Sequence, residues 1–451
     1  MLYEFTIENY RSFGKAQTLS LMRGKERNKP ENLFRPVAGF PDVVRSAAIF
    51  GHNASGKSNF WRAFVLFANL VRISAIGLAS DGPIPGIEPN LLTASGLQEP
   101  TRFEIVFAME GHVYRYGFSA TPEQIVAESL VEELKSGGVD KIFTRTIADA
   151  GGKTEIDFPR ELGRTREGAI RELTRKNALV VSSGANLNVD LLKKIYNHLT
   201  KQLKLISFGP DRPAHFPFAK RMDEDGGFRQ VIERFALDAD FGVCGLRTQM
   251  PPEPTAQEID RFRQTLRSQF GDTVAEASVA NLISGRRPTV YALHRGASGN
   301  SVEFKLSDES QGTQLFLQLA SLLLDVARQG AVAVIDEFGA NIHPLLAKKI
   351  VEFFQNPENN SGSGQLIFTS HQSELLSSEL FRKDQIWFAE KTRSGQTDLF
   401  SLASFRGEKS ARSSEVFAKN YLAGRYGGVG DFGPRFSGVP LHLKAADGGD
   451  E

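Results

Sequence analysis

The feature that most constrains this chain is the spacing G-x-x-x-x-G-K-S, which runs from residue 51 to residue 58. An apolar run at 47–50 precedes it and an apolar segment from residue 60 follows it, so the loop is expected to join a strand to a helix. Glycines at both ends let the backbone fold tightly around an anion-sized concavity lined by N–H groups. The helix that begins near Lys57 directs the positive end of its dipole to the same point. This pattern predicts a phosphate-binding loop (P-loop) and binding of a nucleoside triphosphate.

The residues expected to surround the phosphates are Gly51, His52, Asn53, Ala54, Ser55, Gly56, Lys57, Ser58 and Asn59. Among them, Lys57 is predicted to neutralise charge on the β- and γ-phosphates, and the Ser58 hydroxyl to join the shell of a Mg²⁺ ion. The competing interpretation is a glycine-rich turn without function. The strand before and the helix after are the context that a P-loop requires, and they favour the functional interpretation.

A second constellation lies far along the chain, where the apolar run 331–335 ends in Asp336 and Glu337. A run this continuous is typical of a central parallel strand that is covered on both faces. Asp336 is expected to hold Mg²⁺ at the end of that strand. Glu337 is placed to polarise an attacking water as a general base. Together with the P-loop, the pair predicts hydrolysis of ATP, with Lys57 and Glu337 as catalytic residues.

Two further signals are weaker when taken alone. Ser310 and Gly312 precede a strongly apolar helix expected from Leu315 to Val326. Such a start can bind an anion, although, taken alone, an ordinary N-cap is the better explanation of the serine. His371 ends another strand-like stretch, 365–371, and is placed to meet a γ-phosphate or the attacking water as a third catalytic residue. Taken alone, a histidine in a purely structural role is the better explanation.

Composition limits the remaining classes of function. The 451 residues carry a formal net charge of +1, so any nucleic-acid surface must be a local patch. Cys244 is the single cysteine, which excludes a disulfide within the chain, and it is expected to be buried. No signal peptide is visible and no apolar run approaches the roughly 20 residues of a membrane helix. A soluble cytoplasmic protein without membrane contact is predicted.

The patterns divide the chain into four parts, and the expected fold class is α/β with a mixed sheet. Residues 1–150 would form the first half of a nucleotide-binding head, with an antiparallel β subdomain. Residues 151–288 read as a compact, mainly helical insertion. Residues 289–430 would complete the head, and 431–451 would be a mobile tail.

The order of these motifs resembles the ATPase head of ABC-type proteins, nearest to the SMC, RecF and OLD-like group. The resemblance implies that Ser310 and Gly312 form the signature motif, that His371 is the switch histidine, and that Asn341–Pro344 corresponds to the D-loop. It also implies that the signature of one subunit completes the site of another, so that a head-to-tail dimer holds two ATP molecules. The signature here reads Glu309-Ser310-Gln311-Gly312 and departs from Leu-Ser-Gly-Gly.

More narrowly, the chain resembles bacterial AAA-type ATP-binding proteins associated with abortive infection and phage defence. The stretches that carry this resemblance are Phe5–Phe13, Gly51–Asn59, Asp336–Phe338, Thr369–His371, Asp384–Phe388 and Tyr421–Gly427. It implies a nucleotide-controlled switch. Because no nuclease constellation is visible in the sequence, the toxic activity would reside in a separate effector nuclease. Two alternatives remain open: a RecF- or SMC-like ATPase that binds DNA in repair, and a scaffold that ATP stabilises with negligible turnover.

Overall fold

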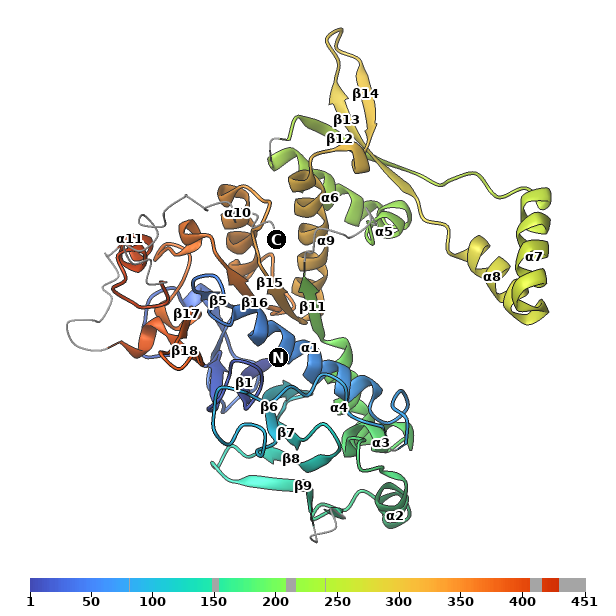
Figure 1. Ribbon diagram of the computed structural model, residues 1–451. Coiled ribbons are helices and arrows are strands. Elements are labelled where there is room, and N and C mark those ends of the chain that lie inside the picture. The colour runs from blue at the N-terminus through green and yellow to red at the C-terminus, as the bar shows by residue number, and fades with distance from the viewer. Residues whose placement is uncertain (81, 148–153, 208–215, 240, 406–415, 430–451) are drawn as a thin grey trace, which may run out of the picture.

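The centre of the molecule is a six-stranded sheet with the order β11-β15-β16-β5-β17-β18 (Figure 1). The computed structural model describes residues 1–451 except 81, 148–153, 208–215, 240, 406–415 and 430–451. Neighbouring strands of this sheet are parallel, apart from the antiparallel pair β17 and β18. The strands are β5 (Ser46–Phe50), β11 (Leu203–Ser207), β15 (Val332–Asp336), β16 (Gln365–Ser370), β17 (Ile386–Lys391) and β18 (Thr397–Ser401). Every residue of β5, β15 and β16 is buried, as expected for apolar strands covered on both faces.

A second, antiparallel sheet lies beside the first, with the order β10-β9-β8-β7-β6-β1-β2. Its strands are β1 (Leu2–Glu8), β2 (Gln17–Ser20), β6 (Thr101–Met109), β7 (His112–Ala120), β8 (Ile125–Glu133), β9 (Val139–Ile147) and β10 (Thr154–Asp157). The side chain of Gln365, at the start of β16, bonds both the main-chain N–H and the carbonyl of Leu2. The two sheets are therefore joined at their buried ends.

Helix α1 (Lys57–Ile73) fills the space between the two sheets. On one side the Phe64 ring stacks on Phe5 of β1, with 3.7 Å between centroids. On the other side the Trp61 indole donates to the carbonyl of Val334 in β15 at 3.3 Å. Helices α9 (Gln311–Gln329) and α10 (Pro344–Gln355) pack in a second core on the opposite face of the central sheet. The predicted α/β class, with a parallel sheet and an antiparallel β subdomain, is confirmed.

Residues 151–288 are distributed differently from the single compact insertion that the sequence suggested. The remaining helices are α2 (Arg164–Leu173), α3 (Val180–Asn186), α4 (Asp190–Lys201), α5 (Ala219–Glu224), α6 (Gly226–Asp238), α7 (Ala256–Phe270), α8 (Asp272–Ser284) and α11 (Phe417–Leu422). Strand β10 pairs with β9, α4 packs on α1, and β11 forms the edge of the central sheet. The described residues from β10 to β11, 154–207, are thus part of the head. Strand β11 escapes sequence analysis because its five residues directly follow the apolar face of α4.

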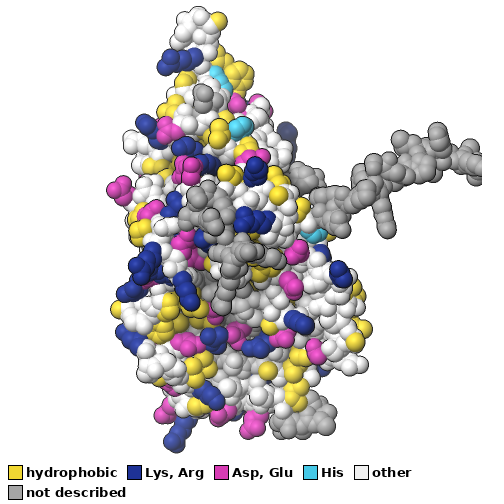
Figure 2. Space-filling model, turned by 90° about the vertical axis from the view of Figure 1, so that its left-hand side faces the viewer, with side chains coloured by type: hydrophobic (Ala, Val, Ile, Leu, Met, Phe, Trp, Pro, Cys, Tyr) yellow, Lys and Arg dark blue, Asp and Glu magenta, His cyan; other side chains and the backbone are white. Residues whose placement is uncertain are grey.

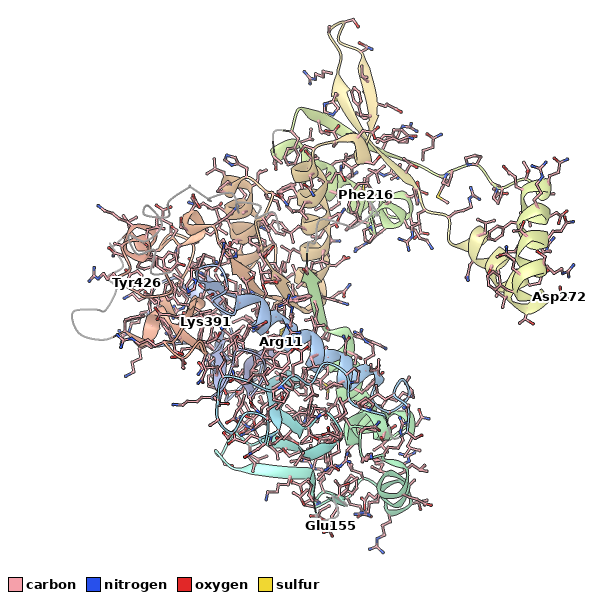
Figure 3. The ribbon with its side chains drawn as sticks, viewed as in Figure 1. Arg11, Glu155, Phe216, Asp272, Lys391 and Tyr426 are labelled. Carbon is pink, nitrogen blue, oxygen red and sulfur yellow. The ribbon has the colours of Figure 1, made fainter. Side chains whose placement is uncertain are left out.

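The part of residues 151–288 that projects from the head is small. Strands β12 (Val243–Gln249), β13 (Thr289–Arg295) and β14 (Ser301–Lys305) form a separate antiparallel sheet. Between β12 and β13 the chain runs out to the α7–α8 hairpin, with Asp272 at its tip (Figures 1 and 3). Cys244 lies exposed on β12, so the expectation that it is buried was wrong. In this two-faced strand its neighbour Val243 faces the core instead.

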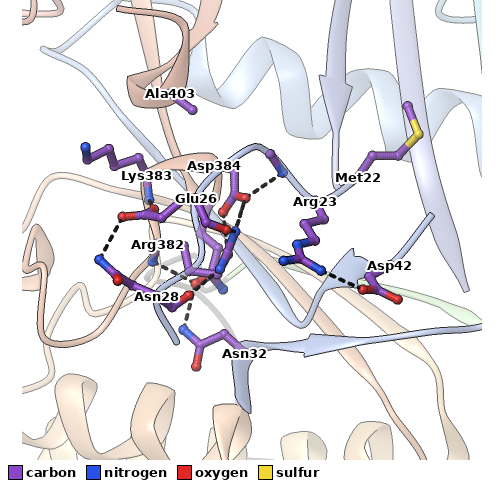
Figure 4. A network of polar contacts seen from close by, with 12 residues as sticks. Met22, Arg23, Glu26, Asn28, Asn32, Asp42, Arg382, Lys383, Asp384 and Ala403 are labelled. Atoms are coloured by element: carbon purple, nitrogen blue, oxygen red, sulfur yellow. Dashed lines mark hydrogen bonds and ion pairs between the residues drawn. The ribbon is translucent and has the colours of Figure 1, made fainter. Parts of the chain in front are cut away.

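A buried ion pair fixes the segment that leads to the P-loop strand (Figure 4). The guanidinium of Arg382 is fully buried and bonds the Asp384 carboxylate at 2.7 Å. It also donates to the main-chain carbonyls of Glu26 and Asn28. These contacts hold the chain before the short 3-10 turn η1 (Pro30–Asn32) and the two-residue strands β3 (Leu33–Phe34) and β4 (Val43–Val44) against the start of β17.

The surface carries both signs of charge. On the face shown in Figure 2, Lys and Arg side chains are interspersed with Asp and Glu. This mixture agrees with the formal net charge of +1. No helix in the described part of the chain is long and apolar enough to span a membrane. The predicted tail, 431–451, lies outside the described residues.

Candidate functional site

The P-loop occupies the turn between β5 and α1, as the sequence predicted. Lys57 is its most buried charged residue, and its ammonium group donates to the carbonyls of Gly51 at 2.6 Å and His52 at 2.9 Å. The Ser55 hydroxyl lies 3.5 Å from the same nitrogen. An ammonium group has three hydrogens, and each has an acceptor in the loop, so a bound phosphate oxygen would take the place of the most distant acceptor, the Ser55 hydroxyl. Ser58 is the second residue of α1 and lies at the positive end of the helix dipole.

Distant parts of the chain hold the loop in shape. Gly56 has φ of +109°, and a Cβ there would lie 2.1 Å from the Thr397 hydroxyl. That hydroxyl bonds the Ser55 carbonyl and the Ser12 hydroxyl, both at 2.9 Å. The Asn59 amide donates to the same Ser12 hydroxyl at 2.9 Å. The β1–β2 turn, β18 and the P-loop therefore form one hydrogen-bonded unit.

The C-terminal end of the described head also contacts the loop. The main-chain N–H of His52 donates to the carbonyl of Gly428 at 2.8 Å. The Tyr421 hydroxyl donates to the same carbonyl at 3.1 Å, and its ring stacks on Phe388 of β17. The closing stretch noted in the sequence, Tyr421–Gly427, thus ends one residue before the one that contacts the P-loop.

Asp336 is the last residue of β15, and Glu337 follows it in an unusual backbone conformation. The Thr369 hydroxyl, on the adjacent strand β16, donates to Asp336 Oδ1 at 2.6 Å. The same hydroxyl accepts from the Glu337 N–H at 2.9 Å, and the Thr369 carbonyl accepts from the Phe338 N–H at 2.8 Å. Glu337 has φ of +56°, the left-handed region that non-glycine residues seldom adopt.

Three parallel strands bring these groups together. Ile335, Phe368 and Ala48 are level across β15, β16 and β5, so the loops that follow all begin at one edge of the sheet. Ligand sites of open parallel sheets lie at the carboxyl ends of their strands. His371 begins the loop after β16 and is exposed at this edge.

The pKa shifts of Lys57 and His371 also reflect how close these residues lie to the carboxylates. Burial lowers the pKa of Lys57 to about 8, and the carboxylates of Asp336 and Glu337 oppose that shift. Desolvation lowers the pKa of His371, the charge of Lys57 lowers it further, and Asp336 opposes both effects. At pH 7 Lys57 is thus mainly charged and His371 mainly neutral. The edge holds one cation, two carboxylates and an imidazole.

These residues fit a Mg²⁺ ion that is bound together with a nucleotide. Mg²⁺ prefers oxygen ligands and usually keeps several waters while sharing phosphate oxygens. Asp336 has one oxygen fixed by Thr369 and the other free of that bond, and Ser58 can supply a hydroxyl. Among the described residues no group of three or more His, Cys, Asp or Glu could hold a metal. A site made from one carboxylate, one hydroxyl and phosphate oxygens agrees with that.

Ser310 and Gly312 lie elsewhere in the same chain. The Ser310 hydroxyl caps α9 by accepting from the Thr313 N–H at 3.1 Å. A Cβ on Gly312 would lie 2.9 Å from the carbonyl of Asn341, in the turn that follows Glu337. The contacts of this pair are with its own helix and that turn, and their predicted contact with a second subunit's nucleotide stays a prediction. The ordinary N-cap, which the sequence analysis gave as the alternative explanation of Ser310, is present.

Sequence analysis therefore located the candidate nucleotide-site residues, but not the residues whose hydrogen bonds hold those residues in place. Lys57, Asp336, Glu337 and His371 come together from segments about 300 residues apart, and their chemical roles stay predictions. It missed Ser12, Thr369, Thr397 and Gly428 as supporting residues. Thr369 lies in the stretch Thr369–His371, which carries the family resemblance, so the sequence pointed to it. Thr397 lies in a strand without any such motif, so nothing in the sequence pointed to it.

The fold and the site define a P-loop nucleotide-binding protein. The family model described as "AAA domain, putative AbiEii toxin, Type IV TA system" matches residues 46–377. The chain belongs to this family, which confirms the resemblance to AAA-type proteins of abortive infection. No curated protein matches the sequence.

Two solved structures are similar at low identity. The SMC head domain from Thermotoga maritima is 13% identical, with a TM-score of 0.37, over 89% of this chain and 98% of that one. UvrA2 from Deinococcus radiodurans is 14% identical, with a TM-score of 0.23, over 50% of this chain and 32% of that one.

Proposed function

We propose that this protein binds ATP with Mg²⁺ and hydrolyses it. The observation that carries the proposal is the convergence of Lys57, Asp336 and Glu337 at the carboxyl-end edge of one parallel sheet, with Lys57 responding electrostatically to both carboxylates. Phosphoryl transfer to water needs positioning and charge stabilisation more than covalent chemistry. This edge supplies both.

Each residue has a defined part in that reaction. The P-loop N–H groups and Lys57 grip the phosphates, while Ser58 and Asp336 would hold the metal, which neutralises charge on the β- and γ-phosphates when bound. Glu337 orients the attacking water and accepts its proton. His371, mainly neutral at pH 7, can donate or accept one hydrogen bond at the γ-phosphate and so responds to its presence.

Hydrolysis would serve as a switch between two states of assembly. Ser310 and Gly312 begin a long helix whose first turn adjoins the Asn341 turn. In this proposal that contact couples nucleotide state to the position of the helix. In this proposal a second copy docks its Ser310–Gly312 segment on the γ-phosphate in a head-to-tail dimer and leaves after hydrolysis.

The description of the family supports a place in defence against phage. It refers to a toxin of a type IV toxin–antitoxin system. Beyond what that description says, we propose that this ATPase is the sensor and regulator of a separate effector nuclease, as the resemblance given in the sequence analysis implies. Capture of such a nuclease only in the ATP-bound state would support this role. ATPase activity stimulated by duplex DNA ends, with no effector bound, would favour the DNA-repair role instead.

The switch is tested by the molar mass of wild type and Glu337→Gln with and without ATP and Mg²⁺. Removing the base leaves the phosphate grip in place, so the variant should bind ATP, stall, and accumulate as a larger assembly, whereas wild type returns to its starting mass as ATP is consumed. Ser310→Arg, which adds bulk at the proposed docking point, should abolish the larger assembly of Glu337→Gln. An unchanged mass of Glu337→Gln under saturating ATP would contradict the switch.

A further inference from the structure

The Thr369 hydroxyl forms hydrogen bonds with both the Asp336 carboxylate and the main chain of Glu337. It lies near the end of β16 and is 2% exposed. Its hydroxyl has a single hydrogen, which goes to Asp336 Oδ1 at 2.6 Å. Its lone pairs remain for the Glu337 N–H at 2.9 Å. One hydroxyl thus satisfies an acceptor on the metal-binding candidate and a donor on the candidate base.

The bond to Asp336 determines which oxygen can meet a metal. A carboxylate on a free side chain can rotate and present either oxygen. With Oδ1 held by Thr369, the carboxylate plane is fixed and Oδ2 is the oxygen left for a cation. Partners that orient a metal ligand in this way commonly change metal affinity or activity by about 10–100-fold when they are removed.

The bonds to the main chain determine where Glu337 points. Glu337 has φ of +56°, a conformation that L-residues with a side chain avoid. Thr369 accepts from the N–H of Glu337 itself through its hydroxyl and from the N–H of Phe338 through its carbonyl, the latter at 2.8 Å. A disfavoured conformation persists only where the surroundings hold it in place. Loss of the hydroxyl removes one of the two bonds.

We propose that Thr369 is a positioning residue that sets the Asp336 carboxylate for Mg²⁺ and the Glu337 backbone for hydrolysis. The proposal rests on the function proposed above. It also links β16, which His371 follows, to the Asp336–Glu337 pair, because Thr369 lies two residues before His371 in the sequence.

The test compares Thr369→Val, which removes the hydroxyl and keeps the branched shape, with Thr369→Ser, which keeps the hydroxyl. Two quantities are measured: affinity for a fluorescent ATP analogue with Mg²⁺ and with EDTA, and the Mg²⁺ concentration for half-maximal ATP turnover. In Thr369→Val we expect turnover to fall, and half-saturating Mg²⁺ to rise, by about 10–100-fold. Metal-free affinity should be unchanged, since the P-loop is intact, and Thr369→Ser should recover most of the loss.

Ser182→Ala is the matched control. Ser182 is equally buried, and its hydroxyl donates to the Val71 carbonyl at 2.6 Å. Val71 lies in the last turn of α1, roughly 20 Å along the helix from Lys57. This variant loses a buried hydroxyl of similar kind, and both measured quantities should match wild type. If Thr369 had a merely structural role, Thr369→Val would not change the Mg²⁺ dependence while Ser182→Ala left it unchanged.

Wild-type Mg²⁺ dependence in Thr369→Val, or failure of Thr369→Ser to recover, would overturn the proposal. Thr369→Ala, which removes the hydroxyl without adding bulk, replaces the valine variant if that one does not fold. If wild type hydrolyses no ATP, the proposed function fails. The gain in affinity for the ATP analogue on adding Mg²⁺ then still decides the role of Thr369, because that gain requires no turnover.

Discussion

Lys57 meets two opposing demands, since it must be charged to bind phosphate and yet lies in the core of its loop. Burial lowers its pKa to about 8. Below pH 8 it is mainly protonated, and a bound phosphate favours that form. Above pH 8 binding must take up a proton, so affinity for ATP should fall by up to about tenfold per pH unit. We expect a decline between pH 8 and 9.5 in titrations with a fluorescent ATP analogue.

Lys57→Arg provides the control for this pH dependence, because arginine stays charged throughout the range. Its affinity, although weakened by the different shape of the side chain, should be flat from pH 7.5 to 9.5. A flat curve for wild type would show that Lys57 does not titrate in this range, and the account of its burial would be wrong.

Gly56 gives a second prediction at this scale. Its φ of +109° disfavours any side chain, and a Cβ would collide with the Thr397 hydroxyl. Gly56→Ala should lower the free energy of unfolding by roughly 1–3 kcal/mol and abolish nucleotide binding, as followed by chemical denaturation and ATP titration.

Gly111→Ala is its control. Gly111 also has positive φ, +83°, but nothing lies within 4 Å of its added Cβ. It should cost about 1–2 kcal/mol through backbone strain alone and leave ATP affinity unchanged. Equal loss of binding in both variants would mean that the contact with Thr397 is unimportant.

Among the elements, helices α4 and α7 both carry apolar residues at helical spacing, but they differ in what those residues contact. Leu192 in α4 is fully buried in the head core, whereas Phe262 in α7 is 38% exposed on the projecting hairpin. Leu192→Ala should therefore destabilise the head by about 2–5 kcal/mol. Phe262→Ala should leave its thermal midpoint almost unchanged. Thermal unfolding of both variants checks this, and a larger effect from Phe262 would place the hairpin within the head core.

The whole molecule shows how far sequence analysis reaches. The P-loop and the Asp336–Glu337 strand were predictable because fixed spacing and continuous apolar runs are local signals. The membership of β11 and α4 in the head was not, because an edge strand is defined by pairing with β15, over 100 residues away. The clamp on the P-loop by Thr397 and Gly428 was equally hidden, since neither contact leaves a pattern in the residues around it.

The central claim is that the three strand ends form an ATPase site, and ATP turnover tests it most directly. Phosphate release is measured for wild type and Glu337→Gln, with ATP binding measured on the same preparations. The account predicts Mg²⁺-dependent turnover by wild type and a loss of at least about 100-fold in the variant, with ATP binding retained. Wild type that binds ATP without hydrolysing it, or a variant as active as wild type, would contradict the account.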